Sequence, residues 1–124
     1  MKSKKDGLAR IIAATGYSAA GLQSAWRTEA AFRQELCLYL LLLPALFLPP
    51  FSLTIKMVLF VANSLVLISE LVNSALEAVV DMVSPDFHPL AKKTKDIGSA
   101  VVFIALLTAL AAWVFAIVSL LAPP

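Results

Sequence analysis

Three long apolar segments dominate the pattern of hydrophobic and polar positions, and they predict three membrane-spanning helices. The first span runs from about 35 to 49, where a Pro-Pro pair indicates a turn. The second covers about 54–83, because no glycine or proline interrupts a helix before Pro85. The third, 97–122, carries no charge over 26 residues. The pattern therefore predicts an all-α membrane protein.

The region ahead of these spans, residues 1–34, has a different pattern. Two short apolar stripes at helical spacing flank a segment that contains Gly16 and Gly21. We therefore expect two short amphipathic helices on the cytoplasmic surface of the membrane, ahead of a three-span domain at 35–122. The stripes consist of Leu8, Ile11 and Ile12, and of Leu22, Ala25 and Trp26.

The composition supports a lipid environment. Apolar residues make up 60% of the 124-residue chain and charged residues 15%. In a typical soluble domain about half of the residues are apolar and about a quarter are charged. The net charge of +2 is too small to indicate a nucleic-acid partner. The lone Cys37 cannot form an internal disulfide.

The basic residues predict the orientation of the spans. Nine of the ten lie on one side, either before the first span or between the second and third. The positive-inside rule makes that side cytoplasmic, so we expect the N-terminus inside and the C-terminal Pro123-Pro124 outside. The nine are Lys2, Lys4, Lys5, Arg10, Arg27, Arg33, Lys92, Lys93 and Lys95; the tenth is Lys56.

A polar stripe runs along the second span. Glu70, Asn73, Glu77 and Asp81 are three, four and four residues apart, which places them on one helix face, with Asn63 one heptad before Glu70. Glu70 lies about 21 Å along the helix from Lys56, inside the hydrocarbon layer, and such carboxylates usually face a bundle interior and carry function. A general base and a polar contact between helices both fit Glu70; Asp81 is expected in solvent.

Carboxylates from separate helices suggest a metal site. Glu29 and Glu35 flank the start of the first span, and Glu77 lies near the same interface, about 31 Å from Lys56. Glu29 and Glu77 could hold a hard cation such as Mg²⁺. A surface ion pair between Glu29 and Arg33, four residues apart, is an equally good reading of Glu29.

The segment at 84–96 is read as a cytoplasmic loop. Its lysines, Lys92, Lys93 and Lys95, could neutralise phosphate groups or contact anionic headgroups. His88, between prolines, is expected to be solvated. The chain contains no P-loop, glycine-rich kinase loop or dinucleotide fingerprint, so the residue pattern alone does not identify a reaction.

Three segments resemble signature blocks of the bacterial integral-membrane diacylglycerol kinase family. They are 29–35 (EAAFRQE), 70–81 (ELVNSALEAVVD) and 91–100 (AKKTKDIGSA), and the similarity extends in order from about Gly7 to about Trp113. The pattern Glu-x-x-Asn-Ser-x-x-Glu after a membrane helix is the most specific part. The segment Asp-Phe-His-Pro at 86–89 departs from the family's usual Glu-Tyr-His-Glu.

This resemblance implies a reaction and an assembly. The family transfers the γ-phosphoryl group of MgATP to the primary hydroxyl of diacylglycerol, which gives phosphatidic acid. It does so in the bacterial inner membrane as a homotrimer of three-span subunits that share their active sites.

The resemblance also implies roles for individual residues. Glu70 would be the catalytic base, Asn73 would orient Glu70 or the acceptor hydroxyl, and Glu29 and Glu77 would hold Mg²⁺. The ATP site would comprise Arg10, Tyr17, Glu29, Glu77, Asp86, His88, Lys95 and Asp96. The lipid site would comprise Arg10, Ala31, Gln34, Glu35, Ser99 and Trp113.

Two other functions fit parts of the sequence. A kinase of another membrane alcohol, such as undecaprenol, would use the same carboxylates, although the block at 29–35 favours diacylglycerol. A proton- or cation-conducting oligomer would need polar residues in the outer halves of the spans, and residues 57–61 and 108–121 offer almost none.

Overall fold

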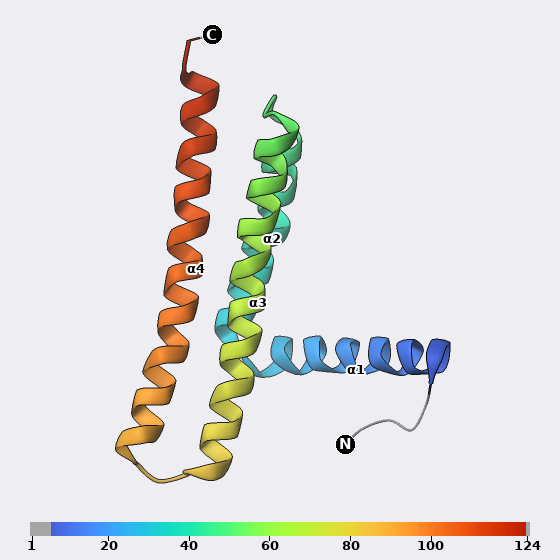
Figure 1. Ribbon diagram of the computed structural model, residues 1–124, viewed down its shortest axis with the longest axis vertical. Helices are drawn as coiled ribbons and strands as arrows, with labels where there is room; N and C mark the ends of the chain where they lie inside the picture. Colours follow the sequence, from blue (N-terminus) through green and yellow to red (C-terminus); the bar gives the residue numbers. More distant parts are fainter. Residues whose placement is uncertain (1–5, 124) are drawn as a thin grey trace.

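The computed structural model describes residues 6–123, which form four helices. Helices α2 (Ala30–Phe47), α3 (Leu53–Val83) and α4 (Pro89–Leu121) stand side by side as a bundle. Helix α1 (Gly7–Thr28) lies crosswise to the bundle and projects away from it where α2 begins, above the α3–α4 connection (Figure 1). Lys2, Lys4, Lys5 and Pro124, which entered the orientation argument, lie outside the described residues.

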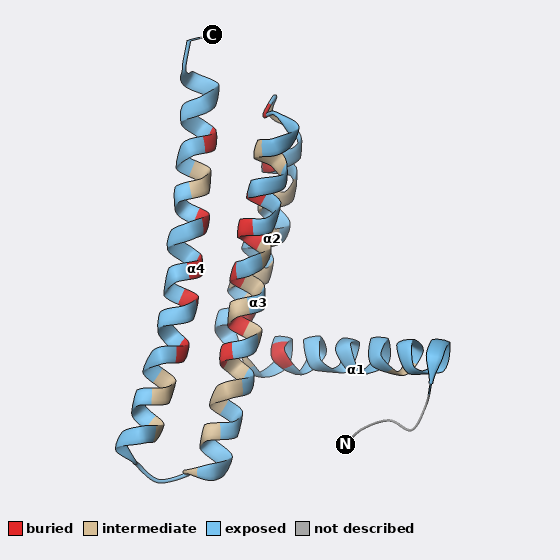
Figure 2. Cartoon of the chain, viewed as in Figure 1, coloured by how far each residue is buried: buried red, intermediate tan, exposed pale blue. Residues whose placement is uncertain are grey.

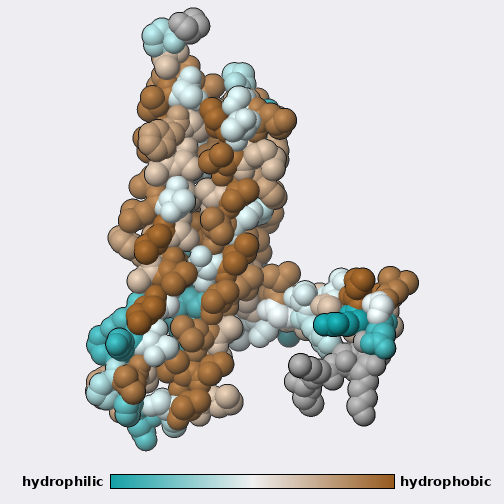
Figure 3. Space-filling view, viewed as in Figure 1, coloured by the Kyte–Doolittle hydropathy of each residue, from teal (hydrophilic) through white to brown (hydrophobic). Residues whose placement is uncertain are grey.

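The three predicted spans are confirmed as helices long and apolar enough to cross a membrane. Brown apolar side chains cover most of the visible bundle, and the hydrophilic side chains gather at its foot, around the α3–α4 connection (Figure 3). Most large apolar side chains of the bundle are exposed in the single chain, as expected for a surface that contacts lipid or other subunits.

The third span begins within a helix that starts earlier than the sequence indicated. Helix α4 begins at Pro89, because proline suits the first helical position and His88 Nδ1 accepts a hydrogen bond from Leu90 N at 3.1 Å. Residues 89–96 are therefore helical, and the predicted loop is confined to 84–88. His88 caps a helix, although it is exposed as expected.

The N-terminal region forms one continuous helix rather than the two that were predicted. Gly16 and Gly21 lie inside α1, where an added Cβ would meet nothing within 4 Å. A helical glycine costs only about 1 kcal/mol relative to alanine, and no proline is present to force a break. Ala25 is the one buried residue of α1, so almost the whole helix faces outward.

The core of the bundle forms two clusters on the facing sides of the helices (Figure 2). Near the far end from α1, Leu46, Phe51 and Leu59 pack with Ala116, and Phe51 meets Trp113 edge to face with ring centroids 6.4 Å apart. Closer to the middle, the buried residues are Ala62, Val66, Ala105 and Ala109. The small side chains let α3 and α4 pack closely along their length.

Candidate active site

The polar stripe of α3 is buried from Asn63 to Asn73 and becomes more exposed toward its end, at Glu77 and Asp81. Asn63, Glu70 and Asn73 are only 5%, 6% and 8% exposed, and they are the buried polar residues of the described chain. Asp81, near the end of the same helix, is exposed as expected. A charged side chain buried in a membrane helix is costly and usually functional, so Glu70 marks the centre of the candidate site.

Three other carboxylates interact electrostatically with Glu70. Glu29, at the junction of α1 and α2, and Glu77, two turns further along α3, both lie close enough for their charges to act on Glu70. Glu35 of α2 interacts with Glu70 in the same way. Glu29 and Glu77 are therefore both within electrostatic reach of Glu70 in a single chain, and their shared metal site stays a prediction.

The junction at Glu29 has a definite cause. Glu29 has an extended backbone (φ −114°, ψ 103°), so it ends α1 and begins α2 at once. Arg33 donates hydrogen bonds to Trp26 O at 2.8 Å and Arg27 O at 3.3 Å, which caps the C-terminus of α1. A Glu29–Arg33 ion pair is absent from the described residues, so the ion-pair reading of Glu29 was wrong.

Asn73 connects the buried stripe to Glu77. Its Nδ2 donates to Glu77 Oε1 at 3.2 Å, whereas the family resemblance implied that it orients Glu70 or the acceptor hydroxyl. Its Oδ1 is buried without a hydrogen-bond partner in the described chain, and lies against Gly98 of α4. Any Cβ at position 98 would overlap that oxygen. The amide is therefore held between Glu77 and the backbone of α4.

Two ion pairs lie near the α3–α4 connection, at the C-terminal end of α3 and the N-terminal end of α4. Lys95 Nζ donates to Asp81 Oδ1 at 2.5 Å, and Lys92 Nζ to Asp96 Oδ2 at 2.6 Å. The hydrogen bond to Asp81 is the main cause that raises the pKa of Lys95 above its ordinary value. Lys95 precedes the charge-free stretch of α4, so it provides a positive charge outside the hydrocarbon layer.

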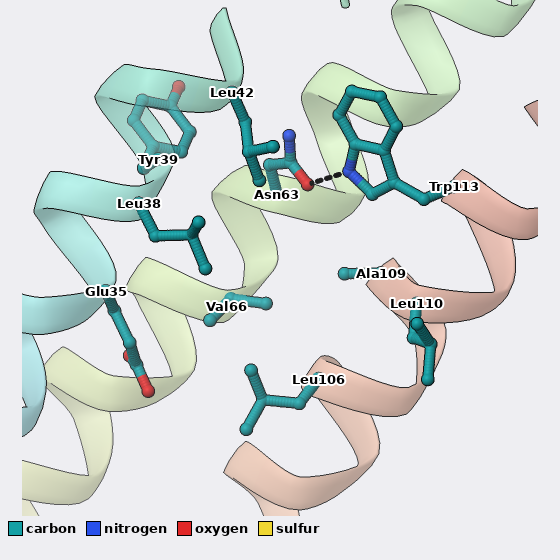
Figure 4. Close-up of a pocket in the computed structure, with 10 residues that line it drawn as sticks. All are labelled: Glu35, Leu38, Tyr39, Leu42, Asn63, Val66, Leu106, Ala109, Leu110 and Trp113. Atoms are coloured by element: carbon teal, nitrogen blue, oxygen red, sulfur yellow. Dashed lines mark hydrogen bonds between the residues drawn. The ribbon is translucent and has the colours of Figure 1, made fainter. Parts of the chain in front are cut away.

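An apolar cavity of about 220 Å³ lies between α2, α3 and α4, with Glu35 at one end and Trp113 at the other (Figure 4). Trp113 Nε1 donates to Asn63 Oδ1 at 3.0 Å, which joins α3 to α4. Tyr39, which also lines the cavity, shares a 3.1 Å hydrogen bond with Ser64. Apart from these polar groups, the lining is aliphatic, so the cavity suits a hydrocarbon chain.

The remaining predicted site residues are spread over the surface of the chain. Arg10 and Tyr17 lie on the N-terminal half of α1, which projects away from the bundle (Figure 1). The others are exposed on α2, on the α3–α4 connection or on α4: Ala31, Gln34, Asp86, His88, Asp96 and Ser99. One chain thus assembles the carboxylates and Asn73, but it does not bring Arg10 and Tyr17 to them.

Sequence reasoning missed two features of the site. It placed Asn63 on the polar face of the second span but did not predict its hydrogen bond with Trp113, because Trp113 is 50 residues away along the chain. It also assigned nothing to Gly98, although a glycine within the long helix of a membrane protein often marks a close approach between helices.

Comparison with known proteins identifies the family. The model of the family described as prokaryotic diacylglycerol kinase matches residues 16–117. Diacylglycerol kinase of Pseudomonas aeruginosa is 49% identical, over 88% of this chain and 89% of the relative. The enzymes of Escherichia coli K12 (43% identical, over 91% of this chain and 93% of the relative) and Helicobacter pylori 26695 (40%, over 84% and 81%) are also similar. This chain therefore belongs to the prokaryotic diacylglycerol kinase family.

Proposed function

We propose that this protein transfers the γ-phosphoryl group of MgATP to the primary hydroxyl of diacylglycerol and so makes phosphatidic acid. The observation that carries the proposal is Glu70, a carboxylate 6% exposed within electrostatic reach of Glu29, Glu77 and Glu35, of which Glu35 lines an apolar cavity within the bundle. A lipid hydroxyl can reach this position from the bilayer. Family membership supports the same reaction.

Glu70 acts as the general base. It takes the proton of the lipid hydroxyl as the hydroxyl oxygen bonds to the γ-phosphorus, and the bond from that phosphorus to the bridging oxygen breaks, which releases ADP. A positioned base contributes about 10²–10⁴-fold to such a step. Most of the remaining catalysis is positioning and charge neutralisation, since phosphoryl transfer needs little covalent chemistry from the protein.

Glu29 and Glu77 would hold the divalent cation. Magnesium usually takes one or two protein carboxylates and fills its other positions with water and substrate phosphates, so two glutamates from separate elements suit it. The described residues contain no group of three or more His, Cys, Asp or Glu that could hold a metal by themselves. Mg²⁺ would supply charge neutralisation at the ATP phosphates. The hydrogen bond from Asn73 holds the Glu77 carboxylate in place.

The two substrates meet at the cytoplasmic interface. Lys95 and Arg10 would face the ATP phosphates, with Tyr17, Asp86, His88 and Asp96 around the nucleotide. Glu35 and Trp113, at the two ends of the cavity, would contact the lipid together with Ala31, Gln34 and Ser99. We assign the nucleotide side to the cytoplasm of a bacterial inner membrane, with the N-terminus inside and the C-terminus outside, on the distribution of basic residues.

A homotrimer with shared active sites completes the proposal. Arg10 and Tyr17 lie on α1, which projects away from the bundle in one chain, so a neighbouring subunit would bring its own α1 to the site. The wide exposed apolar surface of the single chain leaves room for such contacts.

The test is ATP-dependent phosphorylation of dioctanoylglycerol and of a short polyprenol by purified protein in detergent with Mg²⁺. We expect phosphorylation of the glycerolipid, and a loss of at least about 100-fold in kcat for Glu70→Gln, which removes the base but keeps its size. An unchanged thermal unfolding midpoint would show that the variant is folded. Phosphorylation of the polyprenol alone would reassign the substrate, and no turnover of either lipid by folded wild-type protein would refute the kinase.

A further inference from the structure

The cavity between α2, α3 and α4 contains a buried hydrogen-bond donor without an acceptor. Asn63 is 5% exposed, and its Nδ2 has no hydrogen-bond partner in the described chain. The orientation of the amide is determined by Trp113: an indole N–H can only donate, so the amide oxygen must face it and the nitrogen must point away. Figure 4 shows this nitrogen turned toward Leu42. Buried donors are nearly always paired, so this one indicates a ligand with an acceptor.

A second unpaired group lies at the other end of the same cavity. Glu35 Oε2 is buried without a partner, and it can accept a hydrogen bond. The walls between Glu35 and Asn63 are aliphatic and include Leu38, Val66 and Leu106. A matching ligand has a hydroxyl at the end of the cavity where Glu35 lies within electrostatic reach of Glu70, an acceptor at Asn63 and a hydrocarbon body.

Diacylglycerol combines these three features, with a hydroxyl, two ester carbonyls and acyl chains. A polyprenol has a hydroxyl and a hydrocarbon body, but it has no acceptor apart from the reacting hydroxyl to place at Asn63. We infer that Asn63 is a specificity-determining residue that donates a hydrogen bond from Nδ2 to an ester carbonyl of the diacylglycerol. This inference rests on the proposed function.

The separation of the groups permits this contact. Asn63 and Glu70 are seven residues apart on α3, which is about 10.5 Å along the axis, and both side chains lean the same way. In an extended glycerolipid, the hydroxyl oxygen and an ester carbonyl are about five bonds apart, or roughly 6 Å for bonds of ~1.5 Å. With a hydrogen bond of about 2.8 Å at each end, the lipid spans about 12 Å, enough to reach both residues.

The contact has a consequence for substrate choice. An ether lipid of the same shape has the hydroxyl and the chains but lacks the carbonyl oxygens, so it leaves Asn63 Nδ2 unpaired. The protein should therefore discriminate against ether lipids through KM, because the lost hydrogen bond contributes to binding before the phosphoryl transfer and equally during it.

The experiment compares 1,2-dioctanoylglycerol with 1,2-di-O-octylglycerol as substrates of the wild-type protein and of Asn63→Leu. In wild type we expect the KM for the diether to be about threefold to tenfold higher, with a similar kcat. Asn63→Leu, which keeps the number and branching of the side-chain heavy atoms, should raise the KM for the diester to the diether value and leave the KM for the diether unchanged.

Trp113→Phe is the matched variant, because it removes the indole donor but keeps the Asn63 amide. If Asn63 acts only by fixing Trp113, both variants will change the two lipids equally, and that outcome overturns the inference. Equal KM values for the two lipids in the wild-type protein also overturn it, whether or not Asn63→Leu folds. Wild-type phosphorylation of the diester in such a case would leave the proposed function intact, whereas no phosphorylation of either lipid would refute that function instead.

Discussion

Replacing Gly98 with alanine should displace the amide of Asn73. Gly98 is buried where α4 meets α3, and an added Cβ would overlap Asn73 Oδ1 while also lying 3.2 Å from Leu76 Cδ2 and 3.3 Å from Asn73 Cγ. Because Asn73 is itself buried, its side chain has little room to move away. The simplest relief is a rotation of the amide, which breaks its hydrogen bond to Glu77.

Three contributions determine how much Gly98→Ala should change the free energy of unfolding. Overpacking of this kind costs about 1–3 kcal/mol. The lost Asn73–Glu77 hydrogen bond costs a further 0.5–1.5 kcal/mol or so. The better helix propensity of alanine offsets about 1 kcal/mol. Gly98→Ala should therefore destabilise the protein by roughly 0.5–3.5 kcal/mol. A misplaced Glu77 should also raise the Mg²⁺ concentration needed for half-maximal activity.

The assay is thermal unfolding in detergent together with a Mg²⁺ titration of kinase activity. Gly21→Ala is the control: the same chemical change in α1 meets nothing within 4 Å, so it should be neutral or stabilise by up to about 1 kcal/mol. In an Asn73→Ala background, Gly98→Ala should lose most of its effect on unfolding, because the side chain it clashes with is absent. The reasoning is refuted if Gly98→Ala and Gly21→Ala have the same effect on thermal unfolding. It is also refuted if Gly98→Ala destabilises the Asn73→Ala variant as much as it destabilises the wild-type protein.

Three further predictions concern the core, the α1–α2 junction and the charge pair. Leu59→Ala, at a fully buried position, should cost about 2–5 kcal/mol in unfolding experiments, while Leu53→Ala, at a position 76% exposed, should cost much less; equal costs would contradict the assigned core. Arg33→Met removes the hydrogen bonds that cap α1, so amide exchange in the last turn of α1 should accelerate, and unchanged exchange would exclude the cap. Asp81→Asn should lower the pKa of Lys95, measured by NMR titration, toward its ordinary 10.5. Because the interaction with Asp81 raises the pKa of Lys95, the ion pair stabilises the fold below pH 10.5, and this stabilisation is lost as the pH rises through the pKa of Lys95 in the folded protein. A difference in melting temperature between wild type and Asp81→Asn that persists well above that pKa would argue against the Lys95–Asp81 pair.

The sequence by itself determined the spans and the buried face of the second one. A hydrocarbon environment demands long apolar helices, so the charge-free stretches could be read directly as membrane segments. Helical periodicity then placed Asn63, Glu70 and Asn73 on one side of α3, and these three are the polar residues of α3 that are buried in the structure. Both conclusions depend on properties local to one segment.

The tertiary structure decided how residues far apart in the sequence meet. The pairing of Asn63 with Trp113, the contact of Gly98 with Asn73 and the engagement of Lys95 by Asp81 all depend on the register between α3 and α4. That register is set by packing along both helices together, and no local pattern contains it.

At the α1–α2 junction, too, local sequence patterns did not predict which groups meet, although these groups are close in the sequence. Glycines and spacing predicted two N-terminal helices, and the spacing of Glu29 and Arg33 allowed an ion pair as one of two readings of Glu29. The chain instead forms one helix, and Arg33 donates to its terminal carbonyl groups. Local propensities differ by only about 1 kcal/mol per residue, so the free carbonyl groups at the sharp turn determined where the arginine binds.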